Sequence, residues 1–148
     1  MVGYKDIPPD MLIEKIADVL KTKVKEPEWA IVVKTGQHKE RGPYETDWYY
    51  KRLASVLRKI AILGPIGSIR LSAEYGGKVD RGSKRYHAST GSRKIIRQCM
   101  YDLEKLGYVT KSKKGREISP EGLKFLNSIA KELSEKLKED VPEISKYL

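Results

Sequence analysis

Apolar residues recur at three- and four-residue steps along five stretches of the chain, which is the spacing of helices that bury one face. Local signals bound these stretches, since proline favours a first helical turn, glycine ends a helix at low cost, and serine or threonine caps a start. The predicted helices begin near Pro9 or Asp10, cover residues 47–63 and 66–74, run from Ser89 or Thr90 to Leu106, and start again at Ser119.

The apolar side of each predicted helix supplies the expected core, with charged residues on the opposite side. A compact segment after the first helix is expected to add Trp29, Ile31 and Val32 to that core. The helical residues expected to be buried are Leu12, Ile16, Val19, Leu20, Val24, Leu53, Val56, Leu57, Ile60, Leu63, Ile96, Cys99, Met100, Leu103, Leu106, Leu123, Leu126, Ile129, Leu133 and Leu137.

Two short runs between the last two helices, "YVTKS" and "REIS", flank Lys113-Lys114-Gly115 and predict a β-hairpin. Gly107, just before them, is expected to end a helix in the left-handed conformation. The order helix, short helix, long helix, hairpin, helix is typical of a winged helix-turn-helix. The expected fold is therefore mostly α with a small β-hairpin, a single winged-helix-like domain over residues 1–148 with an extra N-terminal helix and a loosely docked tail from about residue 139.

Positive charge is concentrated in the middle of the chain. The formal net charge is +10, and residues 34–100 hold 15 Lys and Arg against 5 Asp and Glu, whereas the two flanking segments are close to neutral. Such concentration indicates a surface that binds a polyanion. The alternative is a basic face that is merely solvated and has no partner.

The second predicted helix carries cations on the side opposite its apolar stripe, next to a tryptophan expected to be exposed. No acidic residue follows these cations at the third or fourth position, so an anionic partner would relieve their mutual repulsion. RNA suits this face better than duplex DNA, because folded RNA offers unstacked bases and phosphates at many angles. For the tryptophan, packing against a neighbouring loop stays open as an alternative. The residues of this face are Trp48, Lys51, Arg52, Ser55, Arg58 and Lys59.

Further candidate contacts to RNA lie in the loop "YGGKVDRGSKRYH", at the start of the fourth helix and at the hairpin tip. The glycine pair of the loop is a candidate to offer backbone N–H groups to a phosphate, although it does not form a Walker loop. Arginines are expected to hold phosphates through paired N–H donors, and lysines to add a broader field. These residues are Gly76, Gly77, Lys78, Arg81, Lys84, Arg85, Arg93, Lys94, Arg97, Lys113 and Lys114.

The sequence lacks the parts of an enzyme or a metal site. His38 and His87 fall in separate loops, and Cys99, the only cysteine, falls on a predicted core stripe, so we expect no catalysis, disulfide, metal or cofactor. No apolar run reaches the roughly 20 residues of a membrane span, and the N-terminus lacks the features of a secretory signal. These observations favour a cytoplasmic protein with no membrane or small-molecule partner.

A DNA-binding transcription regulator is the main alternative function. In that case the fourth helix would enter a major groove and present Arg93, Lys94 and Arg97 to base edges. Because winged helices bind DNA, RNA or proteins, the fold by itself does not decide between these functions.

One combination of residues is specific to a known family: Pro27-Glu28-Trp29, His38-Lys39-Glu40, Pro43-Tyr44, Trp48, Tyr50, Arg52, Ala54-Ser55 and Arg58. Through these residues the segment from Val24 to Ile60 resembles the small-subunit ribosomal protein family nineteen-e of archaea and eukaryotes, and the similarity extends through the glycine loop into the hairpin. The resemblance implies a winged-helix-like protein of the small-subunit head that binds ribosomal RNA, adjoins other head proteins, supports subunit maturation and is ribosome-associated in the cytoplasm. It also implies contacts to RNA from Trp48, Arg52, Arg58, residues 75–81, Arg93 and Arg97. Tyr101 and Arg85 depart from the family pattern, where glutamine and proline are usual.

Overall fold

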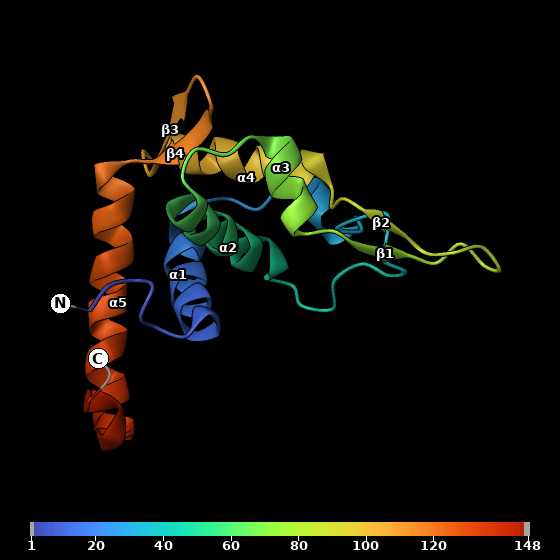
Figure 1. Ribbon diagram of the computed structural model, residues 1–148. Helices are drawn as coiled ribbons and strands as arrows, with labels where there is room; N and C mark the ends of the chain where they lie inside the picture. The colour runs from blue at the N-terminus through green and yellow to red at the C-terminus, as the bar shows by residue number, and fades with distance from the viewer. Residues whose placement is uncertain (1, 147–148) are drawn as a thin grey trace.

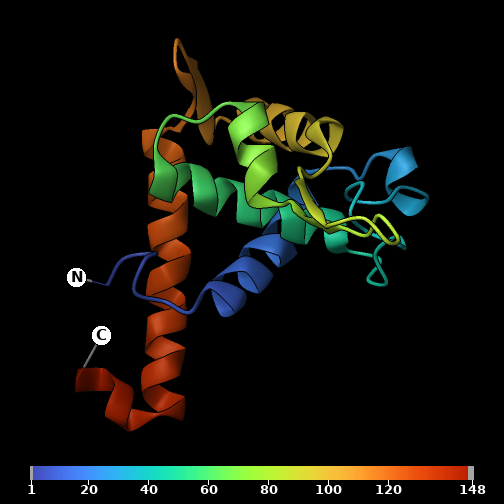
Figure 2. The same ribbon diagram turned by 45° about the vertical axis from the view of Figure 1, so that its right-hand side comes forward.

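Helices dominate the computed structural model, which describes residues 2–146 (Figures 1 and 2). Two small antiparallel hairpins are inserted between the helices. A 3₁₀ turn follows the first α-helix, and another follows the last α-helix. In chain order the elements are α1 Pro9–Lys23, η1 Glu28–Ile31, α2 Trp48–Leu63, α3 Ser68–Glu74, β1 Gly77–Val79, β2 His87–Ser89, α4 Arg93–Lys105, β3 Val109–Ser112, β4 Gly115–Ile118, α5 Pro120–Asp140 and η2 Pro142–Lys146. The mostly helical, winged-helix-like fold predicted from the sequence is confirmed.

Local capping signals place most helix ends where the sequence predicts them. Helix α1 starts at Pro9, and α2 ends before Gly64, whose φ of 74° suits glycine. Gly107 follows α4 with a φ of 77°, as expected. The Ser119 side chain accepts a hydrogen bond from the Gly122 backbone N–H at 3.0 Å and caps α5.

Helix α2 lies in the middle of the molecule and packs against α1, α4 and β4, while α5 stands along one edge (Figure 1). Buried apolar side chains from all five α-helices join one core cluster. The predicted stripes are buried apart from a few positions. Leu63 and Leu123 are exposed, and Val19, Val24 and Leu106 are only partly buried.

The segment after α1 buries much less than predicted. Ile31 and Val32 are 86% and 82% exposed, because Ile31 ends and Val32 follows a single 3₁₀ turn that buries only Ala30 completely. Trp29 is partly buried, with its ring edge-on to Tyr49 at 6.2 Å between ring centroids. The prediction that all three apolar residues point inward is wrong for the two aliphatic ones.

The glycine loop contains a second hairpin that the sequence pattern did not reveal. Strands β1 and β2 pair antiparallel, with Gly77 opposite Ser89, and the connection projects from the body in both views (Figures 1 and 2). We call residues 77–89 the arm. Because Ser89 belongs to the arm, α4 begins at Arg93 with Ser92 at its N-cap, later than predicted. The isolated bridge between Gly36 and Gly91 ties the arm's base to the preceding loop.

The predicted hairpin after α4 is the wing, residues 109–118. Its strands are joined by Lys113 and Lys114, and Val109 is buried against the helices. Backbone hydrogen bonds in both directions between Ile66 and Arg116 fix the wing to the segment before α3. Helix α5 continues to Asp140 and is followed by η2. The loose docking predicted for residues 139–148 stays a prediction, and residues 147 and 148 lie outside the described part of the chain.

The first testable prediction concerns Gly76, at the junction of α3 and the arm. A Cβ atom there would lie 2.2 Å from the Ser89 carbonyl oxygen, so the backbone of the arm would have to shift. We expect Gly76→Ala to speed amide hydrogen exchange in the β1–β2 ladder while leaving exchange in α2 unchanged. Gly67→Ala is the matched control, because a Cβ at that position would meet nothing within 4 Å. Unchanged exchange in the arm of Gly76→Ala would contradict this role.

Candidate nucleic-acid interface

The outer face of α2 is organised around Tyr75, which follows α3. The Arg52 guanidinium and the Lys59 ammonium each lie 4.2 Å from the centre of the Tyr75 ring, and Ser55 shares a 2.8 Å hydrogen bond with its hydroxyl. Burial raises the pKa of Tyr75 to about 12, so the ring keeps its hydroxyl proton. This arrangement holds two cations at fixed positions beside one aromatic ring.

Arg52 is a partly buried cation without a counter-charge. Among residues 2–146 its guanidinium makes no ion pair and donates no hydrogen bond, and burial lowers its pKa. A desolvated cation is costly unless an anion accompanies it. A phosphate bound from outside would supply the missing partner.

Arg58 lies about one and two-thirds helical turns beyond Arg52 and is also partly buried. Its Nε atom is shielded from solvent and has no hydrogen-bond partner in the described part of the chain. The Arg58 guanidinium also makes no ion pair within residues 2–146, so an anion at its accessible nitrogens would supply the missing counter-charge. Arg52 and Arg58 are thus the α2 cations that lack internal compensation.

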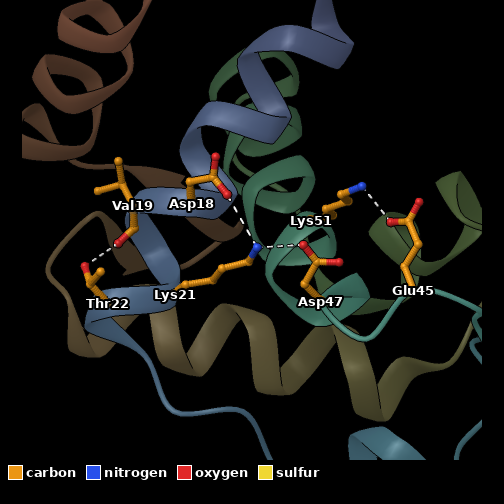
Figure 3. A network of polar contacts seen from close by, with 7 residues as sticks. All are labelled: Asp18, Val19, Lys21, Thr22, Glu45, Asp47 and Lys51. Atoms are coloured by element: carbon orange, nitrogen blue, oxygen red, sulfur yellow. Dashed lines mark hydrogen bonds and ion pairs between the residues drawn. The ribbon is translucent and has the colours of Figure 1, made fainter.

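Lys51 and Lys59 are compensated, contrary to the sequence prediction. Figure 3 shows Lys51 pointing at Glu45, with 2.6 Å between their charged atoms, and Lys59 lies 3.5 Å from Glu74. As expected, no acidic residue within α2 follows these lysines at the third or fourth position. Both carboxylates come instead from segments outside α2. These two lysines therefore contribute less positive potential than expected.

Trp48 is buried instead of exposed, and the open alternative that it packs against a neighbouring segment is the correct one. The residue is 9% exposed, its indole N–H donates to the Ala30 carbonyl at 3.0 Å, and its ring meets Tyr49 edge-on. The segment around η1 covers this ring, which the pattern within α2 alone does not reveal. The premise that Trp48 offers an exposed stacking surface is wrong.

A second polar network fixes the start of α2. Lys21 of α1 lies 2.7 Å from Asp47 and 3.4 Å from Asp18 (Figure 3). The hydrogen bond with Asp47 raises the pKa of Lys21, and the same bond lowers the pKa of Asp47. This clamp positions the first turn of α2, which carries Lys51 and Arg52.

A hollow of about 920 Å³ opens beside the first half of α2. The loop of residues 38–45 forms one side of it, and Arg52, Ser55 and Tyr75 form the other. Tyr44 stands at this hollow with 86% of its surface exposed, and its hydroxyl accepts a hydrogen bond from Arg41. This loop is not among the RNA contacts expected from the residue pattern, although an aromatic residue among basic ones was a usable signal.

The arm presents cations that have no acidic partner in residues 2–146. The Arg81 guanidinium donates a hydrogen bond to the Arg85 backbone carbonyl, at 3.4 Å. The Gly76 N–H donates to the Ala73 carbonyl, so the expectation that it faces a phosphate is wrong. Instead, Gly76 allows α3 to approach β2 closely. The exposed cations of the arm are Lys78, Arg81, Lys84 and Arg85.

Helix α4 connects the arm to the wing. Arg93 and Arg97 are exposed, while the Lys94 ammonium lies 5.2 Å from the Trp29 ring centre. The wing lysines, Lys113 and Lys114, are exposed at the other end of α4, far from the arm in both views (Figures 1 and 2). The structure thus brings together α2, the hollow and the base of the arm, whereas the tip of the wing lies far from the arm.

Other reactive groups are structural. Cys99 is fully buried and burial raises its pKa to about 12, so it is protonated at neutral pH. Tyr49 and Gln98 both hydrogen-bond the buried Asp102 carboxylate. Within residues 2–146, no three His, Cys, Asp or Glu side chains are grouped to hold a metal ion. No helix in that part of the chain is long and apolar enough to span a bilayer.

The chain is similar to known proteins along nearly its whole length. The family model described as ribosomal protein S19e matches residues 3–136. The chain is 48% identical over 150 residues to small ribosomal subunit protein eS19 of Thermoplasma acidophilum, covering all of both chains. It is 38% identical over 155 residues to eS19 of Haloarcula marismortui, covering 99% of each, and 41% identical over 137 residues to eS19B of Schizosaccharomyces pombe, covering 90% of this chain and 96% of the relative. The chain therefore belongs to the ribosomal protein S19e family.

Proposed function

We propose that this protein is a structural component of the small ribosomal subunit head, where it binds ribosomal RNA, adjoins other head proteins and supports subunit assembly and RNA maturation. The single observation that carries the proposal is the set of uncompensated cations on α2 and the arm. Two of them, Arg52 and Arg58, are partly buried without an anion. The names of the relatives support the ribosomal setting.

The proposed contacts are electrostatic and hydrogen-bonded, and they require no catalysis, metal, cofactor or small-molecule substrate. Arginine is suited to this task because its planar guanidinium donates two parallel hydrogen bonds to a phosphate. Arg52 and Arg58 hold phosphates at α2, and Arg93 and Arg97 hold them at the start of α4. The arm and wing lysines extend the positive field around these four anchors. The setting we propose is the ribosome in the cytoplasm.

Salt dependence tests the number of phosphates contacted. If about six phosphates are neutralised, the affinity for structured ribosomal RNA should fall about 10³-fold between 50 and 200 mM salt. The measurement is a filter-binding titration of the full chain at several salt concentrations. A nearly flat dependence would contradict phosphate-based binding.

A DNA-binding regulator is the second candidate, favoured by the exposed Arg93 and Arg97 on α4 and the exposed lysines of the wing. It does not use the uncompensated cations of α2, which lie outside a helix-and-wing contact. Competition between structured ribosomal RNA and random duplex DNA separates the two functions. We expect RNA to compete better. Preference for a palindromic duplex would instead support the regulator.

A further inference from the structure

The hollow beside α2 has the composition of a nucleotide site. Its volume, about 920 Å³, lies within the roughly 300–1,000 Å³ typical of small-ligand pockets. Its lining combines the apolar Ile13 and Pro43 with hydroxyls, cations and the carboxylates of Glu40 and Glu45. A mixture of this kind suits a flat base attached to a charged phosphate, which a purely ionic surface would not distinguish from any other anion.

Tyr44 is the aromatic element of this site. It is exposed to 86% of its surface, although its loop is tied down on either side by polar contacts. The Arg41 guanidinium donates to its hydroxyl at 3.2 Å, and Glu45, next in the chain, pairs with Lys51 of α2. The ring is therefore held near the rim of the hollow, where an unstacked base can lie against it.

Arg52 is the anion-binding element of the same hollow. Its guanidinium carbon lies over the Tyr75 ring, 4.2 Å from the ring centre, and its donors make no ion pair within residues 2–146. A preoriented guanidinium with free donors is suited to bidentate contact with a phosphate. The exposed Tyr44 ring is therefore the expected position of the base, and the Arg52 guanidinium is the expected position of its phosphate.

We propose that this hollow binds a single unpaired nucleotide extruded from an RNA helix, with its base stacked on Tyr44 and its phosphate held by Arg52. This inference rests on the proposed function and adds to it a specific preference. The other cations of α2 and those of the arm bind RNA phosphates and give general affinity for RNA. The hollow adds a preference for an RNA helix that carries a bulged nucleotide.

The test uses two RNA hairpins that differ by one bulged nucleotide, which is a fluorescent adenine analogue in the bulged form. We expect the full chain to bind the bulged hairpin about tenfold more tightly than the paired one, and base stacking to change the fluorescence. Tyr44→Ala should remove the preference and the fluorescence change while leaving affinity for the paired hairpin within about twofold. Arg52→Lys keeps the positive charge but cannot donate two parallel hydrogen bonds to one phosphate, so it should also reduce the preference for the bulged hairpin.

Tyr101→Ala is the matched control, because Tyr101 is an exposed tyrosine on α4 outside the hollow. It should keep the preference for the bulge. Free adenosine monophosphate should not displace the bulged hairpin, and displacement would overturn the assignment to a nucleotide held within RNA. Equal affinity for both hairpins, with strong salt dependence, would overturn the nucleotide site but leave the proposed function standing. Absence of binding to either hairpin would overturn both.

Discussion

Replacing Trp48 with alanine is expected to cost about 3–5 kcal/mol in the free energy of unfolding, the range measured for large aromatic residues in cores. The indole is buried, meets Tyr49 edge-on and donates its N–H to the Ala30 carbonyl. Its removal leaves a cavity and an unpaired carbonyl at the contact between α2 and η1. Urea denaturation monitored by circular dichroism measures the loss.

The control for Trp48→Ala is Tyr44→Ala, an exposed aromatic residue in the same region. That substitution should change the free energy of unfolding by less than about 0.5 kcal/mol, as is usual for surface positions. A Trp48→Ala variant that is as stable as the parent and has lost only RNA affinity would restore the exposed-indole interpretation and contradict the packing described above.

The second large effect is expected from Arg58→Glu. Its guanidinium lies on the outer face of α2, with Nε unpaired, so reversing its charge replaces an attraction to phosphate with a repulsion. We expect affinity for structured ribosomal RNA to fall at least about tenfold, since a hydrogen bond to a charged group contributes roughly 1.5–3 kcal/mol. Incorporation of the variant into small subunits should be blocked.

Arg70→Glu is the matched control for Arg58→Glu, because Arg70 is an exposed arginine on α3 with no ion pair within residues 2–146. The affinity of Arg70→Glu for structured ribosomal RNA should be closer to that of the parent chain than the affinity of Arg58→Glu is. Thermal unfolding of both variants separates a loss of binding from a loss of fold. Normal co-sedimentation of a folded Arg58→Glu variant with small subunits would refute the assignment of α2 to the interface.

The predictions that succeeded depend on signals within a few neighbouring residues. Pro9 starts α1, Gly64 ends α2 and Ser119 caps α5 because each satisfies or terminates local backbone hydrogen bonds. The two-residue turn of the wing is equally local. In all these cases the physical cause lies within one helical turn of the residue that signals it.

The predictions that failed depend on partners distant in sequence. Trp48 is covered by η1, and the carboxylates that compensate Lys51 and Lys59 come from the preceding loop and from α3. The arm was missed because its strands have three residues each, too few to show an alternating pattern. The concentration of charge in residues 34–100 predicted a basic surface, but only the fold shows which cations remain uncompensated.

Mapping protein–RNA cross-links in small subunits purified from cells that express this chain tests directly whether α2 and the arm contact RNA. Ultraviolet irradiation followed by mass spectrometry identifies the peptides that carry a nucleotide. The account predicts cross-links in α2, the loop of residues 38–45 and the arm, and few in α5, where acidic and basic residues are balanced. Cross-links confined to α5, or a chain absent from the small subunits, would contradict it.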